Sequence, residues 1–152
     1  MKHEIQLLGL EEQALAKVAT TLAVRAKLPI LVYLRGELGT GKTTFVRAWL
    51  RALGVKSRIC SPSYTLVEPY CTNQGNYYHF DLYRLHSAEE LEMLGFRDYL
   101  AAGCLIEWPE RANDYLPSPD LLIKLEFAQQ ERNLTLTALS ESGKALIEGL
   151  QT

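Results

Sequence analysis

A segment near the start of the chain combines glycine, lysine and threonine in a pattern that suits phosphate binding. Residues 36–43 read GELGTGKT and fit the phosphate-loop pattern G-x-x-x-x-G-K-[ST] (Walker A) at every fixed position. The glycines allow backbone N–H groups to turn inward around phosphate oxygens. Lys42 would reach the β- and γ-phosphates, and the Thr43 hydroxyl would ligate Mg²⁺. The expected nucleotide-binding residues are Glu37, Leu38, Gly39, Thr40, Gly41, Lys42, Thr43 and Thr44.

The residues on either side of this loop supply the context that the motif needs. Residues 30–35 (ILVYLR) form an apolar, β-prone run typical of a buried parallel strand, and residues 44–50 read as a helix. The helix would add its free N–H groups and the positive end of its dipole to the loop. A chance match in a glycine turn is the alternative, and a strand, glycine loop and helix in order argue against it. We therefore expect a site for a nucleoside triphosphate.

Two carboxylates are candidates for the chemistry of hydrolysis, which needs an acid for Mg²⁺ and a group that orients water. Glu107 ends the apolar run Cys104–Glu107, and carboxyl ends of parallel strands converge on ligands. We expect Glu107, with Thr43, to bind the metal; a surface acid at a strand end is the alternative. Asp81 lies near one end of a predicted strand, where an exposed acid or a turn cap explains it equally well.

Weaker signals accompany these acids. Ser61, Ser63 and Thr65 place hydroxyls in a predicted loop that could sense a γ-phosphate, although turn chemistry also accounts for them. Arg84 could offset phosphate charge or pair with a neighbour. The N-K-x-D motif with which GTPases recognise their base is absent after the loop, which favours ATP. A small-molecule kinase is the second candidate, without an evident lid or a cluster of acceptor-binding arginines.

The hydrophobic pattern predicts the elements that position these residues. A hairpin is expected from strands 64–70 and 77–85, because residues 73–76 (NQGN) form a turn. Helix 11–26 has an apolar stripe for the core, with one edge near the nucleotide base. The remaining predicted elements are strands 4–8, 104–107, 120–128 and 132–138, with helices 87–94, 97–102 and 140–150. These elements predict an α/β, P-loop NTPase-like three-layer domain with a mixed, mainly parallel sheet plus a β-hairpin. We expect residues 1–152 to form a single P-loop ATPase domain.

Composition narrows the class of protein. The chain has 152 residues, 47% of them hydrophobic and 22% charged, and no apolar run approaches a membrane span. Three cysteines without C-x-x-C spacing, three scattered histidines and no signal-peptide core predict a cytoplasmic protein without structural zinc. The net charge of −2 provides no long-range attraction for nucleic acid, so any RNA would be held mainly through partners.

Four motifs occur in an order that resembles one family. They are Gly36–Phe45, Ser61–Val67, His79–Leu85 and Ile106–Glu110. Together they are similar to the TsaE (YjeE) family, small bacterial ATPases of tRNA threonylcarbamoyladenosine biosynthesis. The resemblance runs from about residue 9 to 138, and one departure is Ser63, where the family usually has threonine.

The resemblance implies a role and a set of partners. Such proteins bind TsaD and TsaB, which place a threonylcarbamoyl group on N6 of adenosine 37 in tRNAs that read codons beginning with A. Their ATP hydrolysis sustains repeated turnover of that modification. By motif, Lys42 and Thr43 serve phosphate and Mg²⁺, Glu107 belongs to the Mg²⁺ ligands, and Asp81 becomes a functional acid that orients water or lies just outside those ligands.

Two functions from different classes therefore follow. The first is a Mg²⁺-dependent ATPase with catalytic Asp81 and Glu107, slow alone because the sequence shows no lid and no certain arginine finger. The second is a nucleotide-gated binding module in which hydrolysis is incidental. The resemblance also implies that the segment Ser61–Thr65 responds to the nucleotide.

Overall fold

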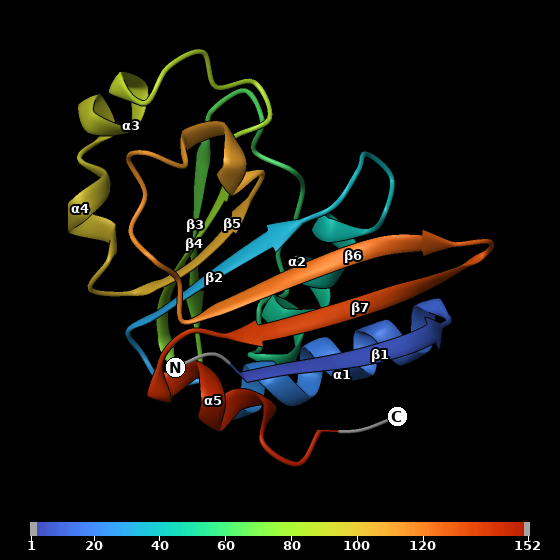
Figure 1. Ribbon diagram of the computed structural model, residues 1–152. Coiled ribbons are helices and arrows are strands. Elements are labelled where there is room, and N and C mark those ends of the chain that lie inside the picture. Colours follow the sequence, from blue (N-terminus) through green and yellow to red (C-terminus); the bar gives the residue numbers. More distant parts are fainter. Residues whose placement is uncertain (1–2, 151–152) are drawn as a thin grey trace.

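The computed structural model describes residues 3–150 and contains helices on both sides of one sheet (Figure 1). The elements are β1 (His3–Leu10), α1 (Glu12–Arg25), β2 (Ile30–Arg35), α2 (Lys42–Ala52), β3 (Val67–Thr72), β4 (Gly75–Asp81), α3 (Glu89–Leu94), α4 (Phe96–Tyr99), β5 (Gly103–Glu107), the 3-10 helix η1 (Pro109–Ala112), β6 (Leu121–Ala128), β7 (Glu131–Ala138) and α5 (Glu141–Ile147). All of the predicted elements are present, with boundaries that differ by a few residues.

The sheet has seven strands in the order β1-β7-β6-β2-β5-β4-β3. Three neighbouring pairs are parallel, namely β2 with β5, β2 with β6, and β4 with β5. Three pairs are antiparallel, namely β1 with β7, β3 with β4, and β6 with β7. The mixed sheet and the predicted β3–β4 hairpin are confirmed. The parallel part is confined to the four central strands, because strands 120–128 and 132–138 form a second hairpin through a turn at residues 129–130.

The strand that precedes the phosphate loop shows why the domain has three layers. Along β2, Ile30, Val32 and Leu34 enter one core with α1, α2 and α5. The intervening Leu31 and Tyr33 enter a second core with α3, α4 and η1. Side chains alternate across a strand, so a strand that is apolar at successive positions must be covered on both faces. Figure 1 shows α1, α2 and α5 on one side of the sheet and α3 and α4 on the other.

Helix α2 anchors the loop to the larger core. Its inward-facing side chains recur at spacings of three and four residues, which places them on one face. All of them are buried: Phe45, Val46, Trp49, Leu50 and, just after the helix, Leu53. The first turn of α2, which begins at Lys42, is thereby fixed against the sheet.

The end of β4 differs from the prediction in a way that affects the site. The predicted strand 77–85 stops at Asp81, because β5 ends at Glu107 and offers no further partner. The Leu82 N–H donates to the Glu107 carbonyl (3.1 Å), and a turn closes with the Leu85 N–H on the Leu82 carbonyl (3.0 Å). Asp81 therefore stands at the carboxyl end of its strand.

Side chains stabilise the start of α5 and the turn before α3. The Ser140 hydroxyl accepts a hydrogen bond from the Gly143 N–H (3.0 Å) and so caps α5. The Glu90 carboxylate accepts from the Ser87 N–H (3.1 Å), which is half of a capping box. Helix α3 starts at Glu89, so Ser87 lies ahead of its capping position. Within residues 3–150, no helix combines the length and apolar character needed to cross a bilayer.

Candidate functional site

Three central strands bring the predicted motifs together at one edge of the sheet. In register, Leu34 of β2 lies beside Glu107 of β5, and Glu107 lies beside Asp81 of β4. The phosphate loop begins directly after β2. Because these strands are parallel, their carboxyl ends meet, and the loop and the two acids become neighbours.

The backbone of the loop requires glycine at two of its fixed positions. A Cβ on Gly36 would lie 2.6 Å from Thr40 Oγ1 and 2.7 Å from the Leu125 carbonyl oxygen, both closer than real contacts allow. Gly41 has φ of 105°, in the left-handed region that favours glycine, immediately before α2 starts at Lys42. The Thr40 hydroxyl closes the turn by donating to the Glu37 carbonyl (2.8 Å).

Lys42 is a buried cation inside this loop, with 5% of its surface exposed. Its Nζ donates to the carbonyl oxygens of Gly36 (2.5 Å) and Glu37 (3.0 Å) and lies 4.5 Å from the centre of the Trp108 ring. Desolvation lowers the pKa of Lys42 below its usual value, and the nearby carboxylates, Glu107 first, act in the opposite direction. A cation whose hydrogen bonds go to neutral carbonyls, at a helix N-terminus, favours an anionic ligand.

Glu107 has two side-chain donors. The Thr43 hydroxyl donates to its Oε2 (2.9 Å) and Oε1 (3.1 Å), and His79 Nε2 lies 2.7 Å from Oε2. Glu107 is 3% exposed and His79 fully buried, so the imidazole holds the carboxylate without competition from solvent. His79 was not recognised as a site residue from the sequence. Its position two residues before Asp81, on the same face of β4, was the available signal.

Asp81 is held as firmly as Glu107 and is 5% exposed. Its Oδ2 accepts a hydrogen bond from the Ser61 hydroxyl, and its Oδ1 accepts from the Tyr83 N–H (3.0 Å). The structure therefore connects the hydroxyl-bearing segment directly to the second acid. The contact with Ser61 joins two motifs that are 20 residues apart in the chain.

A cavity of about 450 Å³ collects most of the predicted residues. It is lined by Leu38, Gly39, Gly41, Lys42, Thr43, Thr44, Ser61, Ser63, Asp81, Tyr83, Arg84, Glu107 and Trp108. Three predicted residues do not line it. Glu37 borders a hollow behind the loop, Thr40 is buried against the loop itself, and Thr65 borders a surface hollow beside Tyr64.

Trp108 is a further site residue that the sequence reading did not assign. It has φ of 59°, an uncommon conformation for a bulky residue, and its ring faces Lys42 and lies 5.0 Å from the Tyr83 ring. The guanidinium carbon of Arg84 lies 4.3 Å from the centre of the Tyr64 ring, at the mouth of the 450 Å³ cavity. Aromatic rings thus hold two of the cations that border the site.

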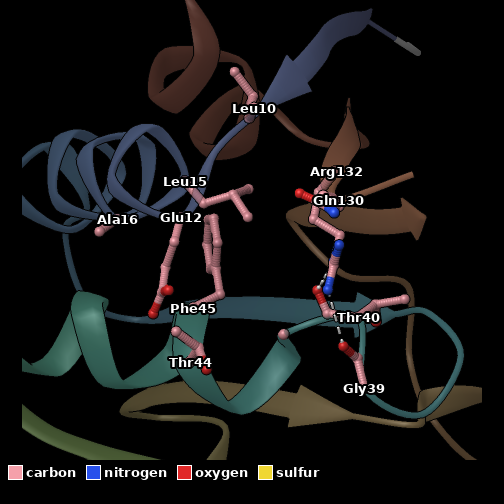
Figure 2. Close-up of a pocket in the computed structure, with 11 residues that line it drawn as sticks. Leu10, Glu12, Leu15, Ala16, Gly39, Thr40, Thr44, Phe45, Gln130 and Arg132 are labelled. Carbon is pink, nitrogen blue, oxygen red and sulfur yellow. Dashed lines mark hydrogen bonds between the residues drawn. The ribbon is translucent and has the colours of Figure 1, made fainter. Parts of the chain in front are cut away.

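A second cavity of about 250 Å³ lies on the other side of the loop (Figure 2). It shares Gly39, Gly41 and Thr44 with the first cavity. Its other lining residues come from the end of β1, the first turns of α1, the loop itself, α2 and the β6–β7 hairpin: Leu10, Glu12, Leu15, Ala16, Thr40, Phe45, Gln130 and Arg132. The predicted edge of helix 11–26 does border the loop, whereas the hairpin residues gave no signal in the sequence.

The oxygens around Thr43 suit one metal in particular. Within residues 3–150, no three His, Cys, Asp or Glu side chains gather into a metal cage. Mg²⁺ needs no such cage, since one or two protein oxygens, phosphate and water complete its ligands. The Thr43 hydroxyl and the Glu107 carboxylate, in mutual contact beside the buried Lys42, are donors of that kind. The residues present therefore fit Mg²⁺.

Comparison with known proteins places this arrangement in a family. The family model described as "Threonylcarbamoyl adenosine biosynthesis protein TsaE" matches residues 10–134. The tRNA threonylcarbamoyladenosine biosynthesis protein TsaE of Haemophilus influenzae is 44% identical over 128 residues, which cover 83% of this chain and 81% of that protein. Its namesake in Bacillus subtilis is 34% identical over 143 residues, covering 92% and 87%. The crystal structure of YdiB from Bacillus subtilis superposes with a TM-score of 0.81 at 28% identity, covering 97% of this chain and 94% of that one.

Proposed function

Because the chain belongs to the TsaE family of tRNA threonylcarbamoyladenosine biosynthesis proteins, we propose that it is a Mg²⁺-dependent ATPase that serves this tRNA modification. One observation carries the proposal. The buried Lys42, the Thr43 hydroxyl and the Glu107 carboxylate face a single cavity at the start of α2. A nucleoside triphosphate with Mg²⁺ is the ligand that uses all three groups.

The two cavities suggest how ATP would lie on the loop. The shared residues Gly39, Gly41 and Thr44 form the ridge between the cavities, and the phosphate chain would cross there. The terminal phosphates would lie on the side of Lys42 and Thr43. The adenosine would occupy the cavity of Figure 2, where Leu15 and Phe45 offer apolar surface and the Glu12 carboxylate could accept a hydrogen bond from the amino group of adenine.

The groups on the far side of the first cavity would carry out hydrolysis. Thr43 and Glu107 would hold Mg²⁺, which when bound would offset the charge of the phosphates. Asp81, in register with Glu107, would orient the attacking water and accept its proton. Because the Ser61 hydroxyl already bonds to Asp81, the segment 61–65 would respond when a γ-phosphate arrives. Arg84 would add a positive charge at the cavity mouth.

The role in tRNA modification is inferred from the family. We expect TsaD-like and TsaB-like partners, with ATP hydrolysis by this chain sustaining repeated addition of the threonylcarbamoyl group to N6 of adenosine 37. The first cavity is open, and a site open to water is a poor environment for phosphoryl transfer, so hydrolysis by the chain alone should be slow. The partners would complete the site.

The test combines two acid variants with the reconstituted modification reaction. Glu107→Gln and Asp81→Asn remove each negative charge with little change in shape, and Asp98→Asn, on an exposed position of α4, is the matched control. The ATPase proposal expects both site variants to bind ATP and partners but to fail at repeated rounds of tRNA modification. Normal repeated modification without hydrolysis would instead support the nucleotide-gated module. Transfer of a labelled γ-phosphate to a metabolite, in place of free phosphate, would establish the kinase alternative.

A further inference from the structure

The side chain of Arg132, at the start of β7, reaches across to the phosphate loop (Figure 2). Its Nε donates to the Thr40 carbonyl (3.0 Å) and its Nη2 to the Gly39 carbonyl (3.3 Å). Its Nη1 donates to the carbonyl of Glu131 (2.9 Å). One guanidinium thus joins two consecutive loop carbonyls to a strand that lies 92 residues further along the chain.

The guanidinium is oriented by the hairpin from which it comes. Phe127 of β6 is the direct cross-strand neighbour of Arg132 in the β6–β7 pair. The guanidinium carbon lies 4.6 Å from the centre of the Phe127 ring. Stacking on an aromatic face, with three N–H groups on carbonyls, leaves the planar group little freedom to rotate.

The orientation of the two carbonyls decides where the loop's N–H groups point. A peptide unit is planar, and its C=O and N–H point in opposite directions. Because the Thr40 carbonyl faces Arg132, the N–H of Gly41 must face away from it. Gly41 lies on the ridge between the two cavities and adopts a left-handed φ of 105°. An N–H fixed at this ridge is placed for a phosphate oxygen.

We propose that Arg132 is a positioning residue that fixes the phosphate loop in its binding conformation. It acts through the backbone of Gly39 and Thr40 and turns the Gly41 N–H toward the ligand. The identity of that ligand as ATP rests on the proposed function, whereas the fixed conformation of the loop does not. Two parallel donors are required for the full effect, so lysine, which is a single point of charge, can replace arginine only in part.

Amide hydrogen exchange in the nucleotide-free protein tests the fixed conformation directly. The variants are Arg132→Ala and Arg132→Lys. The matched control is Arg25→Ala, which removes an arginine that donates to the carbonyls of Leu146 (2.8 Å) and Glu148 (2.9 Å), away from the loop. We expect the amides of residues 39–43 to exchange roughly tenfold faster in Arg132→Ala, with only partial recovery in Arg132→Lys and no change in the control.

Amides of the central strands β2 and β5 report in the same experiment whether the fold is intact. Phe127→Leu is a third variant. It loosens the guanidinium without removing its charge and should accelerate exchange in the same segment to a smaller degree. Wild-type exchange at residues 39–43 in Arg132→Ala would overturn the proposal. Full recovery by Arg132→Lys would also overturn it, because charge alone would then suffice.

Calorimetric titration with adenosine, ADP and ATP separates positioning from direct contact with the nucleoside. If Arg132 keeps the loop in its phosphate-binding conformation, the loss of Arg132 lowers the fraction of molecules with that conformation. The Kd for ADP and ATP should then rise by roughly tenfold. Adenosine, without phosphates, should lose much less affinity than ADP and ATP, although Arg132 also lines the cavity proposed for it. Equal weakening of all three ligands would show a contact with the nucleoside instead. A wild-type chain that binds none of them would refute the proposed ATPase function, and hydrogen exchange would still decide the role of Arg132.

Discussion

The buried contact between His79 and Glu107 leads to a quantitative prediction for His79→Leu. Leucine has no donor, so Glu107 would keep only the Thr43 hydroxyl of its two side-chain partners. A hydrogen bond to a charged group contributes about 1.5–3 kcal/mol. His79 also carries a buried Nδ1 for which residues 3–150 provide no hydrogen-bond partner, and removing such an atom recovers about 1–3 kcal/mol.

These two contributions have opposite signs and similar size. We therefore expect the free energy of unfolding of His79→Leu to change by less than about 1.5 kcal/mol. The effect on metal binding should be much larger, because the partner of a metal-ligating carboxylate typically accounts for about 10–100-fold in metal affinity. The Mg²⁺ concentration that gives half-maximal binding of an ATP analogue should rise by that factor.

The measurement is a titration of a nonhydrolysable ATP analogue at several Mg²⁺ concentrations and in EDTA, with thermal unfolding of each variant as the check on folding. His79→Gln can place an amide N–H near the position of the imidazole Nε2 and should stay within about threefold of wild type. Tyr77→Phe, which alters a buried side chain earlier in the same strand, is the matched control and should leave the Mg²⁺ dependence unchanged.

Two results would refute this reasoning about His79. The first is a wild-type Mg²⁺ dependence in His79→Leu, which would mean that Thr43 alone orients Glu107. The second is an equal loss of nucleotide affinity with Mg²⁺ and in EDTA. That result would mean that the substitution alters the phosphate loop rather than the metal ligands.

Three further predictions concern charge and burial. At saturating Mg²⁺, Glu107→Gln should keep ATP affinity within a few-fold while phosphate release falls by about 100-fold or more. In Asp81→Asn the rate of phosphate release should fall by about 10²–10⁴-fold. A wild-type rate in either variant removes that acid from catalysis. Burial lowers the pKa of Lys42 in the folded protein below its usual 10.5. Between these two pKa values the unfolded chain binds more protons than the folded chain, so the contribution of Lys42 to the free energy of unfolding rises with pH. Urea unfolding of wild type and Lys42→Met up to pH 10.5 should therefore show wild type gaining stability relative to the variant as pH rises, and a constant difference would contradict the buried charge. Burial raises the pKa of the Cys104 thiol to about 12, whereas Cys60 and Cys71 are exposed. A disulfide reagent at pH 8 should therefore react quickly with two thiols and with the third only on unfolding. Three fast-reacting thiols would show that the core around Cys104 opens readily.

Local patterns explain why the centre of the site could be predicted from the sequence. The strand, loop and helix at residues 30–52 follow from neighbouring residues, because the apolar run, the glycines and the spacing of Phe45, Val46 and Trp49 each specify their own element. Glu107 was identified because an acid at the end of an apolar strand is also a local signal. The predicted contact between the loop and this acid needed only one further rule, that parallel strands align their carboxyl ends.

The residues that were missed depend on pairing between distant segments. His79 becomes a partner of Glu107 only because β4 and β5 are adjacent and in register. Arg132 reaches Gly39 and Thr40 only because β6 pairs with β2 and carries β7 alongside. Arg132 sits in no pattern that its own neighbours would reveal, and the spacing of His79 from Asp81 was its only local signal. The early end of β4 has the same origin, since β5 ends at Glu107 and offers no strand partner to the residues beyond Leu82.

The place of β2 in the sheet has a consequence for how the chain acquires its site during synthesis. Both neighbours of β2 come later in the chain, since Ile30 pairs with Gly103 and Val32 with Leu121. The glycine loop therefore leaves the ribosome long before the strands that flank it. The Leu125 carbonyl, which packs against Gly36, and the Arg132 side chain, which binds the loop carbonyls, arrive later still. Long-range strand pairing of this kind is a slow step, so ATP would bind a nearly finished domain and could not guide its early folding. A nascent chain that stops before residue 132 would carry the complete motif without a complete binding site.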